Sequence, residues 1–148
     1  MNVAFQALSV LWFADQISSS FLRNPGGVMI RLKNRGSRRI GFIGAGKAGV
    51  SLGSYFVSKG LEISGYFSRT MESALFAGRI TGSSAFSSLK DLIEYSDIII
   101  ISTPDDVLPA VWKELRTVAP AGRIVAHLSG SLSSDIFEGI GKEGASGY

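Results

Sequence analysis

The chain has 148 residues, 45% of them hydrophobic, which is enough for a single domain with one core. Its formal charge of +3 does not indicate nucleic-acid binding, because residues 1–38 carry five basic groups and one acidic group, whereas residues 39–148 carry ten basic and eleven acidic ones. The lack of cysteine excludes disulfides and thiolate chemistry, and with one histidine and no carboxylate cluster we expect no metal site.

Residues 1–38 are predicted to form an N-terminal extension outside the fold. Val3 to Ala14 are apolar and could form a helix, but this segment is too short to span a bilayer and lacks the features of a secretory signal. Residues 24–27 then break any helix, and Met29 could be an alternative start of translation. A membrane-surface or targeting role for the extension is the alternative. We expect a cytoplasmic protein with no membrane span.

Residues 39–49 predict a strand that enters a glycine turn and then a helix. Residues 40–43 form the apolar run typical of a parallel strand that is buried on both faces. Gly44, Gly46 and Gly49 follow with the spacing G-x-G-x-x-G. In a chain with 18 glycines this spacing alone is a weak signal. Its place between a strand and a helix is what indicates a site for a dinucleotide pyrophosphate.

Each glycine has a separate role in such a site. Gly44 permits the tight turn, Gly46 leaves the backbone open to the pyrophosphate, and Gly49 lets the helix lie close to the sheet. Gly53 falls on the same helix face as Gly49 and could bring the helix unusually near the strand. The free N–H groups of the helix then face the anion. The predicted contacts are Gly44, Ala45, Gly46, Lys47, Ala48 and Gly49.

The same residues also match part of a different phosphate motif. From Gly41 to Lys47 the sequence follows G-x-x-x-x-G-K, the beginning of a nucleoside triphosphate P-loop. The next position requires Ser or Thr to hold magnesium, and Ala48 has no oxygen to offer. Gly41 also lies within the predicted strand rather than in a loop, so the triphosphate interpretation is disfavoured.

Strands and helices alternate through the rest of the chain. We expect, in order, a helix near 47–59, a strand at 61–67, a helix near 71–79, an extended segment at 84–86, a helix to 95, a strand at 97–102, a helix over 103–118 that Pro109 could delay or kink, a strand at 123–128, a helix capped at 133–135 and running to 142, and another strand opening at 145–148. The isoleucines at 98–101 require burial on both faces at the centre of a sheet. This order predicts an α/β fold over 39–148, with a doubly wound, mostly parallel sheet in three α/β/α layers.

The end of the second strand indicates which nucleotide binds. An NAD-binding fold usually has Asp or Glu there, whereas this chain has Ser68, Arg69 and Thr70. Arg69 can pair with a 2′-phosphate, and the flanking hydroxyls can donate to it. The pattern favours NADP over NAD, with an ordinary surface arginine as the alternative. The missing acid also disfavours a methyltransferase.

Two later strand ends should reach the crevice at the carboxyl edge of the sheet. Thr103 and Pro104 would flank the cofactor, and Ser129 would lie toward the nicotinamide. Ser129 is therefore the candidate hydroxyl for contact with a substrate carbonyl, although it could instead only cap the turn. His127 lies within an apolar strand, so a buried, hydrogen-bonded core residue is favoured over an acid or base.

Residues 40–49, 68–70, 102–106 and 127–131 together resemble the N-terminal domain of the 6-phosphogluconate dehydrogenase-like reductases. That group includes pyrroline-5-carboxylate reductase, ketopantoate reductase, 3-hydroxyisobutyrate dehydrogenase and deazaflavin-dependent NADP reductases. Within it the chain is similar to bacterial Rossmann-like candidate oxidoreductases of unknown substrate, in which a His-x-Ser-Gly-Ser segment precedes a helical C-terminal domain. The resemblance covers residues 39–148.

The resemblance implies NADP as cofactor and hydride transfer between its nicotinamide and a small carbonyl or imine substrate. In that group the helical C-terminal domain supplies the substrate pocket, the dimer contacts and usually the proton-transferring residue. The chain stops at Tyr148, so we expect it to lack this domain and any homodimer contacts that the domain would make. The alternative is a Rossmann module without chemistry of its own that senses a nucleotide or binds a partner.

Overall fold

The structure is a computed structural model that describes residues 21–23, 29–31, 38–118, 121–140 and 146–147. The chain divides into two units, residues 1–38 and 39–148. In the first unit, β1 (Phe21–Arg23) and β2 (Met29–Arg31) form a two-stranded antiparallel sheet that the sequence patterns do not indicate. The helix expected at 3–14 and the helix break expected at 24–27 lie outside the described residues.

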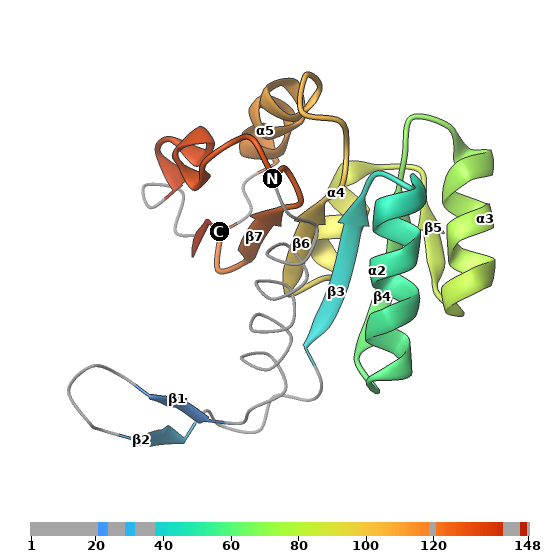
Figure 1. The fold of residues 1–148 in the computed structure, drawn as a ribbon, viewed down its shortest axis with the longest axis horizontal. Helices are drawn as coiled ribbons and strands as arrows, with labels where there is room; N and C mark the ends of the chain where they lie inside the picture. The colour runs from blue at the N-terminus through green and yellow to red at the C-terminus, as the bar shows by residue number, and fades with distance from the viewer. Residues whose placement is uncertain (1–20, 24–28, 32–37, 119–120, 141–145, 148) are drawn as a thin grey trace. The chain divides into compact units, whose positions relative to one another are not determined.

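The second unit is built on one six-stranded sheet in which every neighbouring pair of strands is parallel (Figure 1). Its strands are β3 (Arg39–Ile43), β4 (Glu62–Phe67), β5 (Ser84–Phe86), β6 (Ile98–Ile101), β7 (Ile124–His127) and β8 (Ser146–Gly147). They are arranged in the order β5-β4-β3-β6-β7-β8. The chain builds outward from β3 in one direction and then from β6 in the other, so the predicted doubly wound sheet is confirmed.

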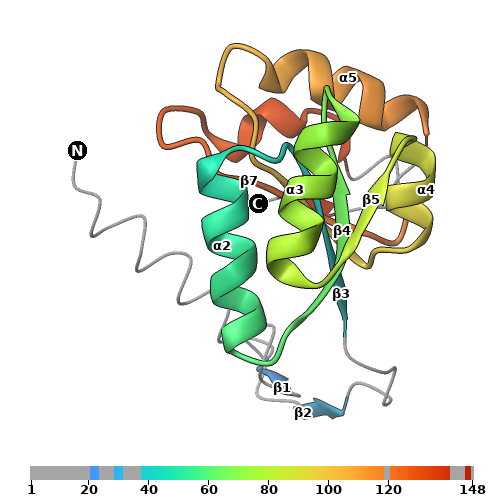
Figure 2. The same cartoon turned by 90° about the vertical axis from the view of Figure 1, so that its right-hand side faces the viewer.

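Helices cover both faces of this sheet and give the expected three layers (Figure 2). They are α2 (Lys47–Ser58), α3 (Met71–Thr81), α4 (Leu89–Glu94), α5 (Leu108–Thr117) and the 3-10 helix η1 (Ser134–Phe137). The helices α2 and α3 lie side by side on one face, and α4 and α5 lie on the other. On the first face the Phe42 ring stacks on Tyr66 at 5.1 Å and lies 6.4 Å from the ring of Phe56 in α2.

The strand β6 lies inside the sheet between β3 and β7, as its isoleucines predict. All four isoleucines are at most 1% exposed. Ile99 and Ile101 belong to the core cluster that includes Leu108 and Trp112 of α5. Full burial of a side chain of this size contributes about 1.5–3 kcal/mol, so β6 is a main anchor of the core. Its end is therefore a firm support for the residues that follow it.

Two helices differ from the sequence prediction. The helix expected from residue 103 begins only at Leu108, with Pro109 in its first turn, where a missing N–H costs no hydrogen bond. Residues 103–107 form a turn instead, in which the Pro104 carbonyl accepts from the N–H groups of Val107 and Leu108 at 3.0 and 3.2 Å. The acidic residues of this turn are thus outside the helix, and of the two outcomes that Pro109 allowed, the delayed start is the one observed.

The helix expected to run to residue 142 is interrupted within the described residues. Ser133 caps it as expected, but the helix that follows is a 3-10 helix that ends at Phe137. Glu138 is extended and Gly139 has a φ of 82°, a left-handed conformation that stops a helix. The other strands and helices of the second unit lie within about two residues of their expected bounds, which is the usual uncertainty of helix and strand ends.

Candidate nucleotide-binding site

The candidate site lies where the carboxyl ends of four parallel strands meet at one edge of the sheet. Because the strands are parallel, the segments that leave β3, β4, β6 and β7 all emerge there. The structure brings every predicted site residue to this edge: Gly44 to Gly49 follow β3, Ser68 to Thr70 follow β4, Thr103 and Pro104 follow β6, and Ser129 follows β7. Whether they contact a nucleotide stays a prediction.

The turn after β3 is held firmly on the side that faces the sheet. Gly44 has a φ of 103°, which an L side chain rarely adopts, and its N–H donates to the Phe67 carbonyl at 2.8 Å. The Ser102 hydroxyl, at the end of β6, donates to the Gly44 carbonyl at 3.0 Å and lies 3.3 Å from the Ile43 carbonyl. The turn is therefore fixed to both strands that neighbour β3.

The other side of the turn is open. Gly46 is the N-cap of α2 and supplies no side-chain cap, and the first turn of α2 contains no acidic residue. Gly46, Lys47 and Ala48 are exposed, and a Cβ placed on Gly46 would meet nothing within 4 Å. The first N–H groups of a helix lack partners within the helix and carry its positive dipole end. The arrangement suits an anion and leaves room for one.

Glycines bring α2 close to the sheet, as predicted. A Cβ on Gly49 would overlap the Ser102 hydroxyl oxygen, and a Cβ on Gly53 would overlap the Tyr66 hydroxyl. The Tyr66 hydroxyl is buried and has no hydrogen-bond partner among the described residues. Burial raises the pKa of Tyr66, while the nearby Thr81 hydroxyl, which donates to the Ala77 carbonyl, opposes that shift.

The segment after β4 presents one cation to the site. Arg69 is exposed and has no hydrogen-bond or ion-pair partner within the part of the chain that the structure describes. Thr70 is instead the N-cap of α3, where its hydroxyl accepts from the Ser73 N–H at 3.3 Å and donates to the Ser73 hydroxyl at 2.8 Å. Arg69 is thus free to bind an anion, whereas Thr70 already has a structural role.

Ser129 is the centre of a compact turn after β7. Its hydroxyl oxygen accepts from the N–H groups of Ser131 and Leu132 at 3.2 and 3.0 Å. Its own N–H donates to Nδ1 of His127 at 3.1 Å, so His127 carries its proton on Nε2 when neutral. With both lone pairs engaged, the Ser129 hydroxyl has its proton left to donate, and the Ser131 hydroxyl oxygen lies 3.5 Å away. It therefore caps the turn, as the alternative held, and a ligand would compete with Ser131 and Asp105 for that proton.

Two buried polar atoms near this edge lack partners among the described residues: Oγ1 of Thr103 and Nε2 of His127. The His127 ring lies 5.3 Å from the ring of Phe137 in η1, in apolar surroundings. His127 as a whole is only half-buried, so its ring lies at the margin of the core with Nε2 covered, and the predicted full burial is met only in part. The expected hydrogen bond is present at Nδ1 only.

One contact at the edge was not predicted from the sequence. The Ser131 hydroxyl donates to Oδ2 of Asp105 at 2.5 Å and so joins the loop after β6 to the loop after β7. This hydrogen bond and the nearby Ser129 hydroxyl lower the pKa of Asp105 below its usual value, and His127 adds a smaller effect in the same direction. The only available signal was that both residues follow strands that end at the same edge.

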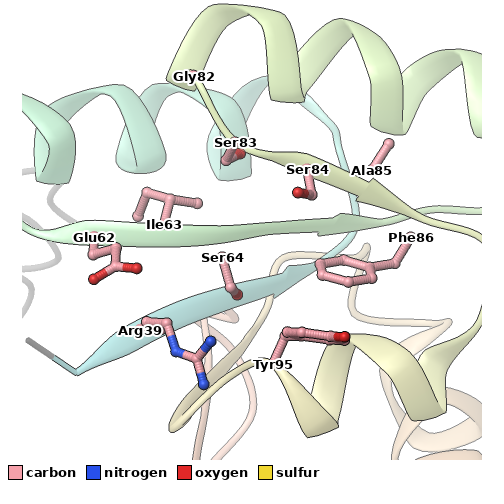
Figure 3. Close-up of a pocket in the computed structure, with 10 residues that line it drawn as sticks. All are labelled: Arg39, Glu62, Ile63, Ser64, Gly82, Ser83, Ser84, Ala85, Phe86 and Tyr95. Atoms are coloured by element: carbon pink, nitrogen blue, oxygen red, sulfur yellow. The ribbon is translucent and has the colours of Figure 1, made fainter. Parts of the chain in front are cut away.

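Open hollows lie beside the site and away from it. One, of about 710 Å³, is lined by Ala45 of the glycine turn and by residues of α3 that include Glu72, Phe76 and Arg79. Another, of about 670 Å³, lies by Arg39 and Glu62, the first residues of β3 and β4 (Figure 3). Its lining continues to Phe86, the last residue of β5, and includes none of the predicted site residues.

Within the described ranges, the structure has no cluster of three or more acidic or histidine side chains able to hold a metal ion. None of the helices described is both long and apolar enough to span a bilayer. A search of the curated proteins finds none that matches this sequence.

Solved structures share the fold at low sequence identity. A candidate NADP oxidoreductase from Bacteroides fragilis is 24% identical with a TM-score of 0.64, over 70% of this chain and 40% of that one. A 3-hydroxyisobutyrate dehydrogenase from Mycobacterium tuberculosis is 18% identical with a TM-score of 0.64, over 75% of this chain and 39% of that one. An imine reductase from Myxococcus stipitatus in complex with NADP+ is 20% identical with a TM-score of 0.61, over 74% of this chain and 39% of that one. The chain spans about two fifths of the length of these proteins.

These likenesses show the fold. They include a 3-hydroxyisobutyrate dehydrogenase, which is one of the enzymes in the group that the sequence resembles. A family model described as a Rossmann-like domain matches residues 29–147, which is most of the chain. The chain belongs to the Rossmann-like domain family.

Proposed function

We propose that residues 39–148 form the NADP-binding domain of an oxidoreductase that transfers a hydride between nicotinamide and a small carbonyl or imine. The observation that carries the proposal is the open N-terminus of α2. There Gly46 faces free space, and no acidic side chain lies in the first helical turn. The turn before it is fixed to β4 and β6, so the site is formed before any ligand arrives.

The residues present fit the pyrophosphate of a dinucleotide. The exposed N–H groups at Gly46, Lys47 and Ala48 would donate to it, and the helix dipole adds a favourable charge. Lys47 adds a cation at the first helical position. A side chain at position 46 would fill the space that the anion needs, which is why this glycine matters for binding and not for packing.

Arg69 supports NADP over NAD. Its guanidinium is exposed and has no partner among the described side chains, at the strand end where a ribose 2′-phosphate is expected. A guanidinium can bind a phosphate through two parallel hydrogen bonds, and Ser68 can add a third. The imine reductase with the same fold is bound to NADP+, which agrees with this choice of cofactor.

The nicotinamide end would lie over the ends of β6 and β7. The cofactor supplies the hydride, and the protein orients the ring and the substrate. Thr103 and Pro104 would flank the cofactor, and Ser129 would donate its hydroxyl proton as a hydrogen bond to a carbonyl or imine. The Ser129 oxygen already accepts two N–H groups, which makes its hydroxyl a better donor.

Nucleotide titration tests the proposal directly. NADPH should bind, and NADH should bind about tenfold more weakly or worse, because the 2′-phosphate adds charge-assisted hydrogen bonds. The Arg69→Ala variant should lose this preference. Lys90→Ala is the matched control, because it removes one exposed positive charge on α4, across the sheet from α2. Equal binding of NADPH and NADH by the wild-type chain would contradict the choice of NADP.

A second measurement separates an enzyme from a nucleotide-sensing module. The chain would be incubated with NADPH and a panel of small carbonyls and imines, and NADPH oxidation would be followed by absorbance. Oxidation that needs both the chain and one of these compounds would support hydride transfer. Tight NADPH binding without oxidation of NADPH by any compound of the panel would favour the sensing module.

A further inference from the structure

Two loops at the candidate site are joined through the Asp105 side chain. The first loop leaves β6 and contains Asp105, and the second leaves β7 and contains Ser131. The Ser131 hydroxyl donates to Oδ2 of Asp105 at 2.5 Å across 26 residues of sequence. We call this hydrogen bond the loop clasp. The nearby Ser129 hydroxyl, in the same turn as Ser131, also acts on Asp105.

The second loop is ordered by the same residues. The Ser129 oxygen accepts from the N–H groups of Ser131 and Leu132, which defines a turn over residues 129–132. Ser131 therefore has two functions, because its N–H closes this turn and its hydroxyl fixes the turn to Asp105. Without Asp105, the turn would keep its internal bonds but lose its attachment to the neighbouring loop.

The clasp contributes little to the core, because Asp105 and Ser131 are both exposed. Asp106 follows Asp105 in the same loop, is also exposed, and has no hydrogen-bond partner among the described residues. Asp105 and Asp106 are thus similar in charge and exposure, but only Asp105 binds the second loop. The late start of α5 makes this possible, because it leaves both residues in a loop.

We propose that the loop clasp positions the Ser129 turn over the nicotinamide end of the bound cofactor, with Asp105 as a positioning residue. The inference rests on the proposed function, because the nicotinamide is placed by the binding of the pyrophosphate at α2. The adenosine end lies at the other side of the crevice, by Arg69. The clasp therefore affects one half of the cofactor and not the other.

For the loss of the Asp105 carboxylate, electrostatics alone and the loop clasp predict opposite changes in NADPH affinity. NADPH is a polyanion, so removal of a carboxylate near the crevice should leave its binding unchanged or make it tighter. A clasp predicts weaker binding after the same change, because the unattached loop loses entropy when the cofactor orders it. Asp105→Asn removes the charge but keeps an amide oxygen that can accept from Ser131. Asp105→Ala removes both.

The experiment compares two ligands on the wild-type chain and on Asp105→Ala, Asp105→Asn, Ser131→Ala and Asp106→Ala. NADPH spans the whole crevice, and adenosine 2′,5′-bisphosphate contacts only its adenosine end. We expect Asp105→Ala and Ser131→Ala to bind NADPH about tenfold more weakly and the bisphosphate with unchanged affinity. Asp105→Asn should stay within about threefold of wild type for NADPH, and Asp106→Ala should match wild type.

Several results would overturn the clasp. Unchanged NADPH binding by Asp105→Ala would do so, as would equal weakening of both ligands or an Asp105→Asn variant as weak as Asp105→Ala. Failure of the wild-type chain to bind either ligand would instead refute the proposed function. The positioning role would then fall with it, and the amide NMR shifts of Ser131 and Leu132 in Asp105→Ala would test the contact between the loops alone.

Discussion

The substitution Gly49→Ala separates the packing role of a glycine from its effect on the helix. Gly49 lies within α2, and its backbone has no positive φ, so alanine is compatible with its conformation. On helix propensity alone the change should stabilise the protein by about 1 kcal/mol. The added Cβ, however, would overlap the Ser102 hydroxyl oxygen and lie 3.0 Å from the Ser102 Cβ and 3.1 Å from the Gly44 carbonyl oxygen.

These contacts determine how much Gly49→Ala should change the free energy of unfolding. Overpacking against a fixed strand end costs about 1–3 kcal/mol. The Ser102 hydroxyl must also turn away from the Gly44 carbonyl, which it contacts at 3.0 Å, at a further cost of about 0.5–1.5 kcal/mol. After the helix-propensity gain, we expect Gly49→Ala to lower the free energy of unfolding by about 0.5–3.5 kcal/mol.

Urea unfolding followed by circular dichroism measures this change. Gly46→Ala is the matched control, because its Cβ meets nothing within 4 Å and the loss of a glycine N-cap costs at most about 1 kcal/mol. The double variant Gly49→Ala/Ser102→Ala should recover at least about 1 kcal/mol relative to additivity, because the overlapping oxygen is gone. A Gly49→Ala protein as stable as wild type would refute the reasoning.

Three further predictions concern the same unit. Gly53→Ala should destabilise by about 1–3 kcal/mol through overlap with the Tyr66 hydroxyl, and the added change Tyr66→Phe should restore most of the loss in the same unfolding assay. Burial raises the pKa of the Tyr66 hydroxyl in the folded protein. The neutral hydroxyl therefore contributes its full stability below pH 10.0, and that contribution is lost as the pH rises through the raised pKa. The fall in the free energy of unfolding at alkaline pH should be smaller in Tyr66→Phe. Thr70→Ala should cost about 1 kcal/mol by removing the cap on the Ser73 N–H, while the preference for NADPH that we assign to Arg69 persists in titration.

The fold could be predicted because its signals are local. Glycine spacing, the isoleucines of β6 and the regular alternation of elements each depend on neighbouring residues, and right-handed crossovers then give a parallel sheet with helices on both faces. The roles of Gly49 and Gly53 were also predictable, since residues one helical turn apart share a face. The unpredicted strands β1 and β2 have no clear alternation and are only three residues each.

The site could be predicted only in part, because strand ends are local features but loop contacts are not. Arg69 and Ser129 reach the edge simply because they follow parallel strands. The bond between Asp105 and Ser131 depends on where α5 begins, and Pro109 allows that helix to begin earlier with a kink or later without one. Once the later start is chosen, Asp105 lies in a loop and can reach Ser131.

The Ser102 hydroxyl connects the packing of α2 to the proposed binding of the cofactor. It holds the Gly44 carbonyl toward β6, and in a planar trans peptide the following N–H, that of Ala45, then points away from β6. Ser102→Ala should release this peptide and weaken NADPH binding. The double variant Gly49→Ala/Ser102→Ala should therefore recover stability but not affinity. If titration shows that both return together, the hydroxyl only fills space and does not orient the peptide.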